Sequence, residues 1–61
     1  MTDVHTLVHD LRAPLAVVEG FADLLFRRGE ELSAEARAEH ARRIAEAARE
    51  MRALLDATRE E

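Results

Sequence analysis

Apolar residues in the first half of the chain recur at alternating steps of four and three positions. This spacing keeps side chains on one face of an α-helix and is typical of a coiled coil or a helical bundle. A second apolar row runs beside the first, and a stripe of this width suits a helix that contacts two neighbours. The first row comprises Val4, Val8, Leu11, Leu15, Val18, Ala22 and Leu25, and the second comprises Leu7, Leu11, Pro14, Val18, Phe21 and Leu25. We therefore predict a helix over about residues 3–28.

The segment after this helix carries the signals of a tight turn. Arg27 and Arg28 place positive charge in the last helical turn, and Gly29 suits a left-handed cap position. Ser33 is a good N-cap for a following helix. A connection this short joins antiparallel neighbours, so we predict a turn over about residues 29–33.

The second half of the chain repeats the apolar spacing and predicts a helix over about residues 34–59. Its apolar row comprises Ala41, Ile44, Ala48, Met51, Leu55 and Thr58, flanked by Ala47 and Leu54. Opposite charges at helical spacing occupy its other face, namely Glu39 with Arg43, Arg42 with Glu46, and Arg52 with Asp56. Each such pair contributes only about 0.2 to 0.5 kcal/mol, which is typical of a solvated face. His40 is interpreted as an ordinary residue at the boundary of the apolar row.

Length and composition favour self-association. A chain of 61 residues buries too little surface to be comfortably stable alone, and the absence of cysteine excludes disulfides, thiolate metal sites and redox chemistry. The predicted fold is therefore a single all-α domain over residues 1–61, an antiparallel helical hairpin that homodimerises into a four-helix bundle.

The net charge of −4 comes from positive and negative residues interspersed along the chain, which argues against nucleic acid as a partner. No apolar run approaches the roughly 20 residues of a membrane span, so no direct membrane contact is expected.

Three residues of the first helix break the local rules. His9 lies one position beyond Val8, and about 100° of rotation takes it off the apolar stripe toward solvent. Pro14 removes an amide donor inside the helix at a cost of about 3 kcal/mol, and Gly20 costs about 1 kcal/mol more. Local conflicts of this kind tend to mark functional sites, although a tolerated kink is the alternative explanation for Pro14.

A strip of small and apolar residues follows His9 on the side that the apolar spacing turns away from the stripe. Such a strip beside an exposed histidine suggests a docking surface for a partner. The alternative is that the alanines are simply good helix formers. The strip comprises Ala13, Ala16, Val17, Gly20 and Leu24.

The residues from His9 onward resemble the phosphoacceptor motif of the largest family of sensor histidine kinases, the HisKA or DHp domain of two-component systems. The resemblance covers His9-Asp10-Leu11-Arg12-Ala13-Pro14-Leu15 and continues through Val18, Glu19, Gly20, Phe21, Ala22, Asp23, Leu24 and Leu25. The family pattern is a histidine, an acidic residue, a variable residue, Arg, usually Thr, then Pro and Leu. With the antiparallel second helix, the resemblance extends over nearly the whole chain.

The resemblance implies a role for each matching residue. His9 would be the phosphoacceptor, and Asp10 the acidic neighbour that accepts a hydrogen bond from the ring and helps remove its proton. Pro14 would provide the family's helix bend. Arg12, one turn from His9, would meet phosphate oxygens, with a pair to a carboxylate as the alternative. A neutral imidazole with one nitrogen held by a carboxylate presents its other lone pair to phosphorus, which agrees with this assignment.

The resemblance also implies partners that this chain does not contain. ATP and Mg²⁺ would act through a separate catalytic domain, and a receiver-domain aspartate of a response regulator would take the phosphoryl group. The chain lacks a Gly-rich phosphate loop and any asparagine, so we expect no cofactor in it and no activity from it alone. The resemblance suggests a cytoplasmic domain whose parent is anchored in a bacterial plasma membrane.

One position departs from the family pattern. Ala13 stands where the family usually has Thr or Asn, a side chain implicated in positioning the water that dephosphorylates the regulator. An alanine methyl cannot orient water, so we predict that the parent protein is a weak phosphatase or lacks this activity.

Two rival interpretations use the same residues differently. His5 and His9 are spaced i, i+4 as two zinc ligands can be, and Asp3 or a dimer mate would have to complete the set. The second rival is a plain dimerisation hairpin whose motif is no longer phosphorylated. We favour the phosphoacceptor interpretation because it accounts for His9 without an incomplete metal ligand set.

Overall fold

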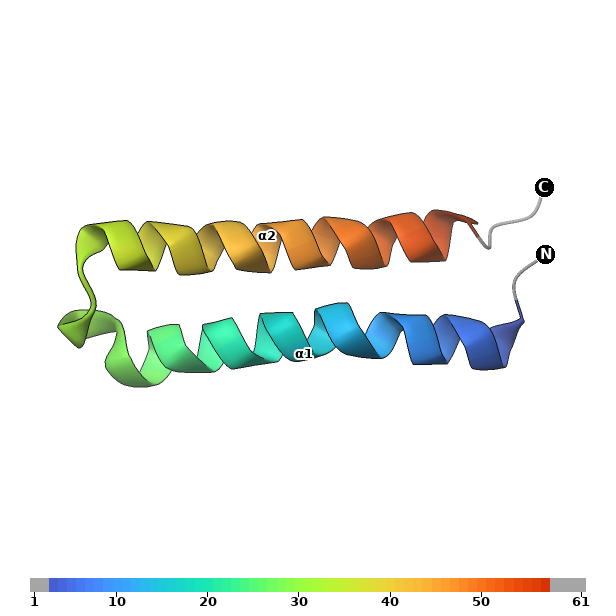
Figure 1. Cartoon of the computed structure of the whole chain (residues 1–61), viewed down its shortest axis with the longest axis horizontal. Coiled ribbons are helices and arrows are strands. Elements are labelled where there is room, and N and C mark those ends of the chain that lie inside the picture. Colours follow the sequence, from blue (N-terminus) through green and yellow to red (C-terminus); the bar gives the residue numbers. More distant parts are fainter. Residues whose placement is uncertain (1–2, 58–61) are drawn as a thin grey trace.

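The computed structural model describes residues 3–57 and consists of two antiparallel helices joined by a short turn (Figure 1). Helix α1 spans Val4–Arg28, a 3₁₀ turn η1 spans Gly29–Glu31, and helix α2 spans Ala34–Ala57. The all-α hairpin predicted from the apolar spacing is confirmed. Thr58 and the predicted extension of the second helix to about residue 59 lie outside the described residues.

The end of α1 differs from the left-handed glycine cap predicted by the sequence. Gly29 has φ −54° and ψ −39°, so the backbone continues in the right-handed helical region. Instead of reversing at the glycine, the chain tightens into η1 and leaves it at Leu32, which is extended at φ −86° and ψ 147°. The Leu32 N–H donates to the Gly29 carbonyl at 3.2 Å, which satisfies a helix-end carbonyl without a left-handed residue.

The start of α2 is fixed by two polar side chains. The Ser33 hydroxyl oxygen accepts a hydrogen bond from the Ala36 N–H at 3.0 Å, so the predicted N-cap is confirmed. The Arg37 guanidinium donates to the carbonyls of Gly29 at 3.1 Å and Leu32 at 2.8 Å. A side chain in the first turns of α2 therefore ties down the turn that precedes it.

Packing between the helices uses the second apolar row of α1. Pro14 on α1 and Ala47 on α2 are buried, and Ala47 is 5% exposed. Half-buried neighbours extend this contact along both helices, namely Leu7, Leu11, Val18, Phe21 and Leu25 on α1, and Ala36, Ile44, Met51 and Leu54 on α2. The hairpin thus has a single line of contact and only a thin core.

The members of the first apolar row that the second row does not share, together with Phe26, have no cover within residues 3–57. Val4, Val8, Leu15 and Phe26 are 72%, 45%, 41% and 88% exposed, respectively. Positions 8, 15 and 26 fall within about 20° of one another around the helix, so these side chains form one exposed line. We call this line, together with Val4 and the exposed Ala22, the apolar stripe. The sequence predicted a helix that contacts two neighbours, and the hairpin supplies one of them.

The shape of the chain agrees with an uncovered face. Its Cα envelope measures 45 × 17 × 11 Å, so it is one helix thick in its shortest direction. It exposes 4939 Å², whereas a compact folded monomer of this length exposes about 4000 Å². The excess of about 900 Å² is close to the ~800 Å² that each partner buries in an interface of standard size. Within residues 3–57, neither helix is both long and apolar enough to cross a membrane.

The outer face of α2 is held by ion pairs, as its sequence predicts. The guanidinium of Arg42 contacts the carboxylates of both Glu39 and Glu46. Arg43 reaches Glu39 at 3.4 Å, and Arg52 reaches Asp56 at 3.9 Å. The hydrogen bond from Arg42 lowers the pKa of Glu39. Glu39, Arg42, Arg43 and Glu46 are each about half exposed, so this network adds little stability.

Candidate functional site

His9 lies in the second turn of α1 with its side chain 85% exposed. No described residue covers the ring, and within residues 3–57 its polar contact is with its sequence neighbour Asp10. The predicted rotation off the apolar stripe is therefore confirmed. An imidazole in this position is open to a partner macromolecule.

Asp10 holds one side of the His9 ring. The Nδ1 atom of His9 lies 3.4 Å from Oδ1 of Asp10, a distance at the long end of hydrogen bonding. A carboxylate beside Nδ1 favours the tautomer that carries its proton there, and that tautomer leaves a lone pair on Nε2. Since Asp10 is 46% exposed, the contact orients the ring without burying it. The arrangement leaves the Nε2 atom of His9 free to act as a nucleophile.

Pro14 lies five residues after His9, inside a continuous α1. Its ring is buried, which agrees with a packing role, and its missing N–H leaves the Asp10 carbonyl without its helical donor. The helical hydrogen bond that Pro14 removes is therefore missing at Asp10, the residue whose side chain contacts His9. The helix bend that the resemblance implies remains a prediction.

Arg12 lies on the other side of His9, toward the apolar stripe. It lines a shallow hollow with Val8, Leu11 and Leu15, and it makes no ion pair with any residue between 3 and 57. A phosphate contact for Arg12 stays a prediction, and so does the alternative pair with a carboxylate of another chain.

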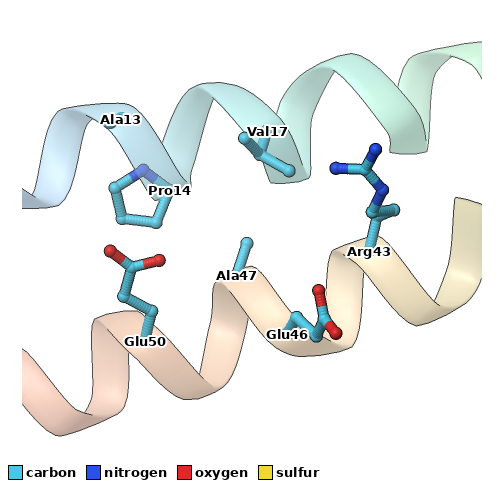
Figure 2. A pocket seen from close by; sticks show the side chains of 7 residues that line it. All are labelled: Ala13, Pro14, Val17, Arg43, Glu46, Ala47 and Glu50. Carbon is cyan, nitrogen blue, oxygen red and sulfur yellow. The ribbon is translucent and has the colours of Figure 1, made fainter.

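The strip predicted as a docking surface is divided between two hollows that share Val17. One lies on α1 alone and is lined by Ala16, Val17, Gly20, Phe21 and Leu24. The other is a groove between the helices, which Ala13, Pro14 and Val17 line together with residues of α2, and Pro14 and Val17 point toward α2 (Figure 2). Val17 is half-buried, whereas the other four predicted positions are exposed.

The α2 wall of this groove was not predicted as functional from the sequence. Arg43, Glu46 and Glu50 line it, with Ala47 between them (Figure 2). Sequence spacing assigns Arg43 and Glu46 to a solvated face, and nothing in it shows which residues of α1 they oppose. Their positions opposite α1 follow from the register of the hairpin. We call this hollow, lined by Ala13, Pro14, Val17, Arg43, Glu46, Ala47 and Glu50, the interhelical groove.

Comparison with known protein families identifies the family of this chain. A family model of the His Kinase A (phospho-acceptor) domain matches residues 4–60. The chain belongs to this family. The match places it among the phosphoacceptor and dimerisation modules of two-component histidine kinases, which act in signal transduction. No curated protein and no solved structure matches the chain.

The zinc alternative finds no support in the described part of this His Kinase A domain. Within residues 3–57, no group of three or more His, Cys, Asp or Glu side chains is placed to hold a metal ion. His5 and His9 are both exposed on α1, and neither makes an ion pair with Asp3. The two histidines therefore share a helix face without a third ligand from residues 3–57.

His40 is half-buried, as predicted for a residue at the boundary of the apolar row. Its ring packs against Phe21 of α1 with centroids 4.9 Å apart, and its Nδ1 atom is buried without a hydrogen-bond partner. The guanidinium of Arg43 lies 5.5 Å from the centroid of the same phenyl ring. In this His Kinase A domain, the aromatic contact between Phe21 and His40 helps hold the helices together near the turn.

Proposed function

We propose that this domain is the phosphoacceptor and dimerisation module of a sensor histidine kinase. His9 receives the γ-phosphoryl group of ATP from a separate catalytic domain and passes it to a receiver-domain aspartate of a response regulator. The observation that carries the proposal is the 85% exposed imidazole beside the Asp10 carboxylate, in a chain that belongs to the His Kinase A family.

The chemistry assigned to this chain is a nucleophilic substitution at phosphorus. The Nε2 lone pair of His9 forms a bond to the γ-phosphorus while the bond to the bridging oxygen of ADP breaks. The Asp10 carboxylate stabilises the positive charge that develops on the ring and accepts the Nδ1 proton, which leaves a neutral phosphoimidazole. Arg12, three positions after His9, supplies positive charge for the phosphoryl oxygens. ATP and Mg²⁺ would be held by the separate catalytic domain.

The second part of the proposal is a homodimeric four-helix bundle. The apolar stripe of α1 has no cover within residues 3–57, and a second hairpin has the same stripe to offer. The excess exposed surface of about 900 Å² is enough for an interface of standard size. The strip comprising Ala13, Ala16, Val17, Gly20 and Leu24 lies elsewhere on α1, so it remains available to the receiver domain.

The direct test is to incubate the chain with a histidine-kinase catalytic domain and labelled ATP and then to map the label. We expect one acid-labile phosphoryl group, which the substitution His9→Gln abolishes. His5→Gln is a matched control, since His5 is another exposed histidine on the same helix. Label that persists in His9→Gln, or a chain that stays unlabelled with a competent catalytic domain, would support the unphosphorylated hairpin instead.

A further inference from the structure

His5 and His9 place two imidazoles one helical turn apart on α1. Both side chains are exposed, and within residues 3–57 only Asp10 makes a polar contact with either ring. The first turns of α1, where the pair lies, are at the end of the hairpin opposite η1 (Figure 1). Residues four apart on a helix have their Cβ atoms about 5–6 Å from each other, a separation that lets both rings turn toward one ion. The two histidines are therefore free to share a ligand.

The contact between His9 and Asp10 prepares one of these rings to bind a metal ion. The Nδ1 atom of His9 lies 3.4 Å from Oδ1 of Asp10, and a proton held on Nδ1 leaves the lone pair on Nε2. In metal sites, a histidine ligand almost always donates its other ring N–H to a carboxylate, a carbonyl or water, which fixes the ring and raises its basicity. The same Nε2 atom that the proposed function uses as a nucleophile is therefore also a prepared metal ligand.

The charges beside the pair favour a cation. Between residues 3 and 12, Asp3 and Asp10 are acidic and Arg12 is the one permanently positive side chain. Asp3 is exposed and lies two positions before His5, and Asp10 is half exposed beside His9. Two carboxylates against one guanidinium leave this end of α1 with a negative balance, which attracts a divalent cation.

The number of ligands limits what such an ion does. Within residues 3–57, no third His, Cys, Asp or Glu is placed to complete a ligand set, so water must fill the remaining positions. A structural zinc has four protein ligands, and an ion held by two imidazoles leaves far more easily. Neutral imidazole suits Cu²⁺, Ni²⁺ and Zn²⁺, and affinity is highest for Cu²⁺. The pair therefore fits a reversibly bound ion and not a resident cofactor.

We propose that His5 and His9 chelate a divalent transition-metal ion, Cu²⁺ most tightly, and that the bound ion blocks phosphoryl transfer at His9. The Nε2 lone pair of His9 forms a bond either to the metal or to phosphorus, so the two events exclude each other. His5 takes no part in the phosphoryl chemistry and supplies the second bond that holds the ion over its neighbour. The metal site stands on the histidine pair alone, whereas the block rests on the proposed function of His9.

The site is tested by titrating the full chain with Cu²⁺, followed by calorimetry and by amide NMR. We expect one ion per chain, and paramagnetic broadening that begins with the amides of residues 5–9 and spares those around His40, a lone half-buried histidine. His5→Gln should weaken binding by about tenfold or more, because the remaining imidazole loses the chelate. Thr6→Gln changes the exposed neighbour of His5, keeps both imidazoles and should bind as the wild type does. Mg²⁺, which prefers oxygen ligands, should leave these amides unchanged.

Broadening that begins elsewhere in the chain overturns the site. So does a His5→Gln variant that binds Cu²⁺ as tightly as the wild-type chain.

The block is tested by labelling His9 with a catalytic domain and ATP at increasing Cu²⁺. Without the ion, His5→Gln should accept label as the wild type does. With the ion, its labelling should persist to a concentration about tenfold or more above the one that stops the wild-type chain. Both chains meet the same ATP and the same catalytic domain, so any effect of Cu²⁺ on those components is common to them. Loss of label at one concentration in both chains overturns the block.

The two measurements keep this inference distinct from the proposed function. The titration needs neither ATP nor a phosphorylated histidine, so it decides the metal site by itself. A His9 that accepts no label even without Cu²⁺ would remove the proposed function, and the block with it, and would leave a metal site found by the titration in place.

Discussion

Gly20 has open space where a β-carbon would stand, although it lies inside the 25-residue helix α1. Nothing within this chain requires the missing side chain, and glycine costs about 1 kcal/mol relative to alanine in a helix interior. A close approach of another backbone or side chain would explain its presence. Gly20 also lines the hollow on α1 with Ala16, Val17 and Leu24, part of the predicted docking strip.

The substitution Gly20→Ala should therefore separate stability from function. We expect the free energy of unfolding to rise by about 1 kcal/mol, because the methyl group meets no obstacle and reduces the freedom of the unfolded chain. We expect phosphoryl transfer from His9 to a receiver domain to slow several-fold, since the methyl group would stand in the docking surface. Urea denaturation and single-turnover transfer measure the two effects.

Gly29 supplies the matched control for this experiment. It has a right-handed helical backbone and open space at its β position, and it lies in η1, outside both hollows. Gly29→Ala should also stabilise the hairpin without changing the transfer rate. If Gly20→Ala transfers as fast as the wild-type chain, the strip does not closely contact the receiver domain.

Ala13 has no polar side chain at the position where the family pattern usually has Thr or Asn. It lines the interhelical groove one helical turn from His9, and its methyl group offers no hydrogen bond to a water molecule. We predict weak or absent phosphatase activity in the parent protein, and a faster decay of the phosphorylated cognate regulator with Ala13→Thr. The decay of labelled regulator measures this. Rapid loss stimulated by the wild-type kinase, with no increase in Ala13→Thr, would contradict the prediction.

Among the elements, the turn shows how much of the fold the sequence could determine. Ser33 was predictable as the N-cap because its side chain acts on the N–H three residues ahead of it. Gly29 was not predictable, because glycine permits a left-handed cap without requiring one. The clamp from Arg37 to the carbonyls of Gly29 and Leu32 spans up to eight residues and depends on how the turn folds back. Local signals therefore located the turn, and longer contacts set its conformation.

Loss of the Ser33 cap should destabilise the hairpin by about 1 kcal/mol. In Ser33→Ala, the Ala36 N–H loses its acceptor and must turn to water at the exposed end of α2. Thermal unfolding followed by circular dichroism should show the loss, and Ser33→Asp should restore most of it because aspartate caps equally well. If both variants melt at the wild-type temperature, the cap does not contribute to stability.

In the whole molecule, the two apolar rows of α1 differ in how far α2 buries them. The sequence predicted both rows and could not tell which of them faces α2. The hairpin packs the row that contains Pro14 and Phe21, and it leaves Val8 and Leu15 exposed. The same limit applied to the site: His9 could be found from its motif, whereas the groove wall with Glu50 needed the register between helices.

The exposed row makes a test of the dimer possible within one helix. Leu15 lies in the apolar stripe and is 41% exposed, whereas Leu24 lies in the docking strip and is 38% exposed. Leu15→Asp should place an unpaired carboxylate in the dimer interface at a cost of about 3 kcal/mol or more, which weakens association over a hundredfold. Leu24→Asp makes the same chemical change at nearly the same exposure and should leave the dimer intact. Sedimentation equilibrium distinguishes the two outcomes.

Because a lone hairpin has only a thin core, Leu15→Asp should also lower the melting temperature at low protein concentration, where mass action no longer favours the dimer. Equal effects of the two substitutions on association would place the interface on a different face from the apolar stripe.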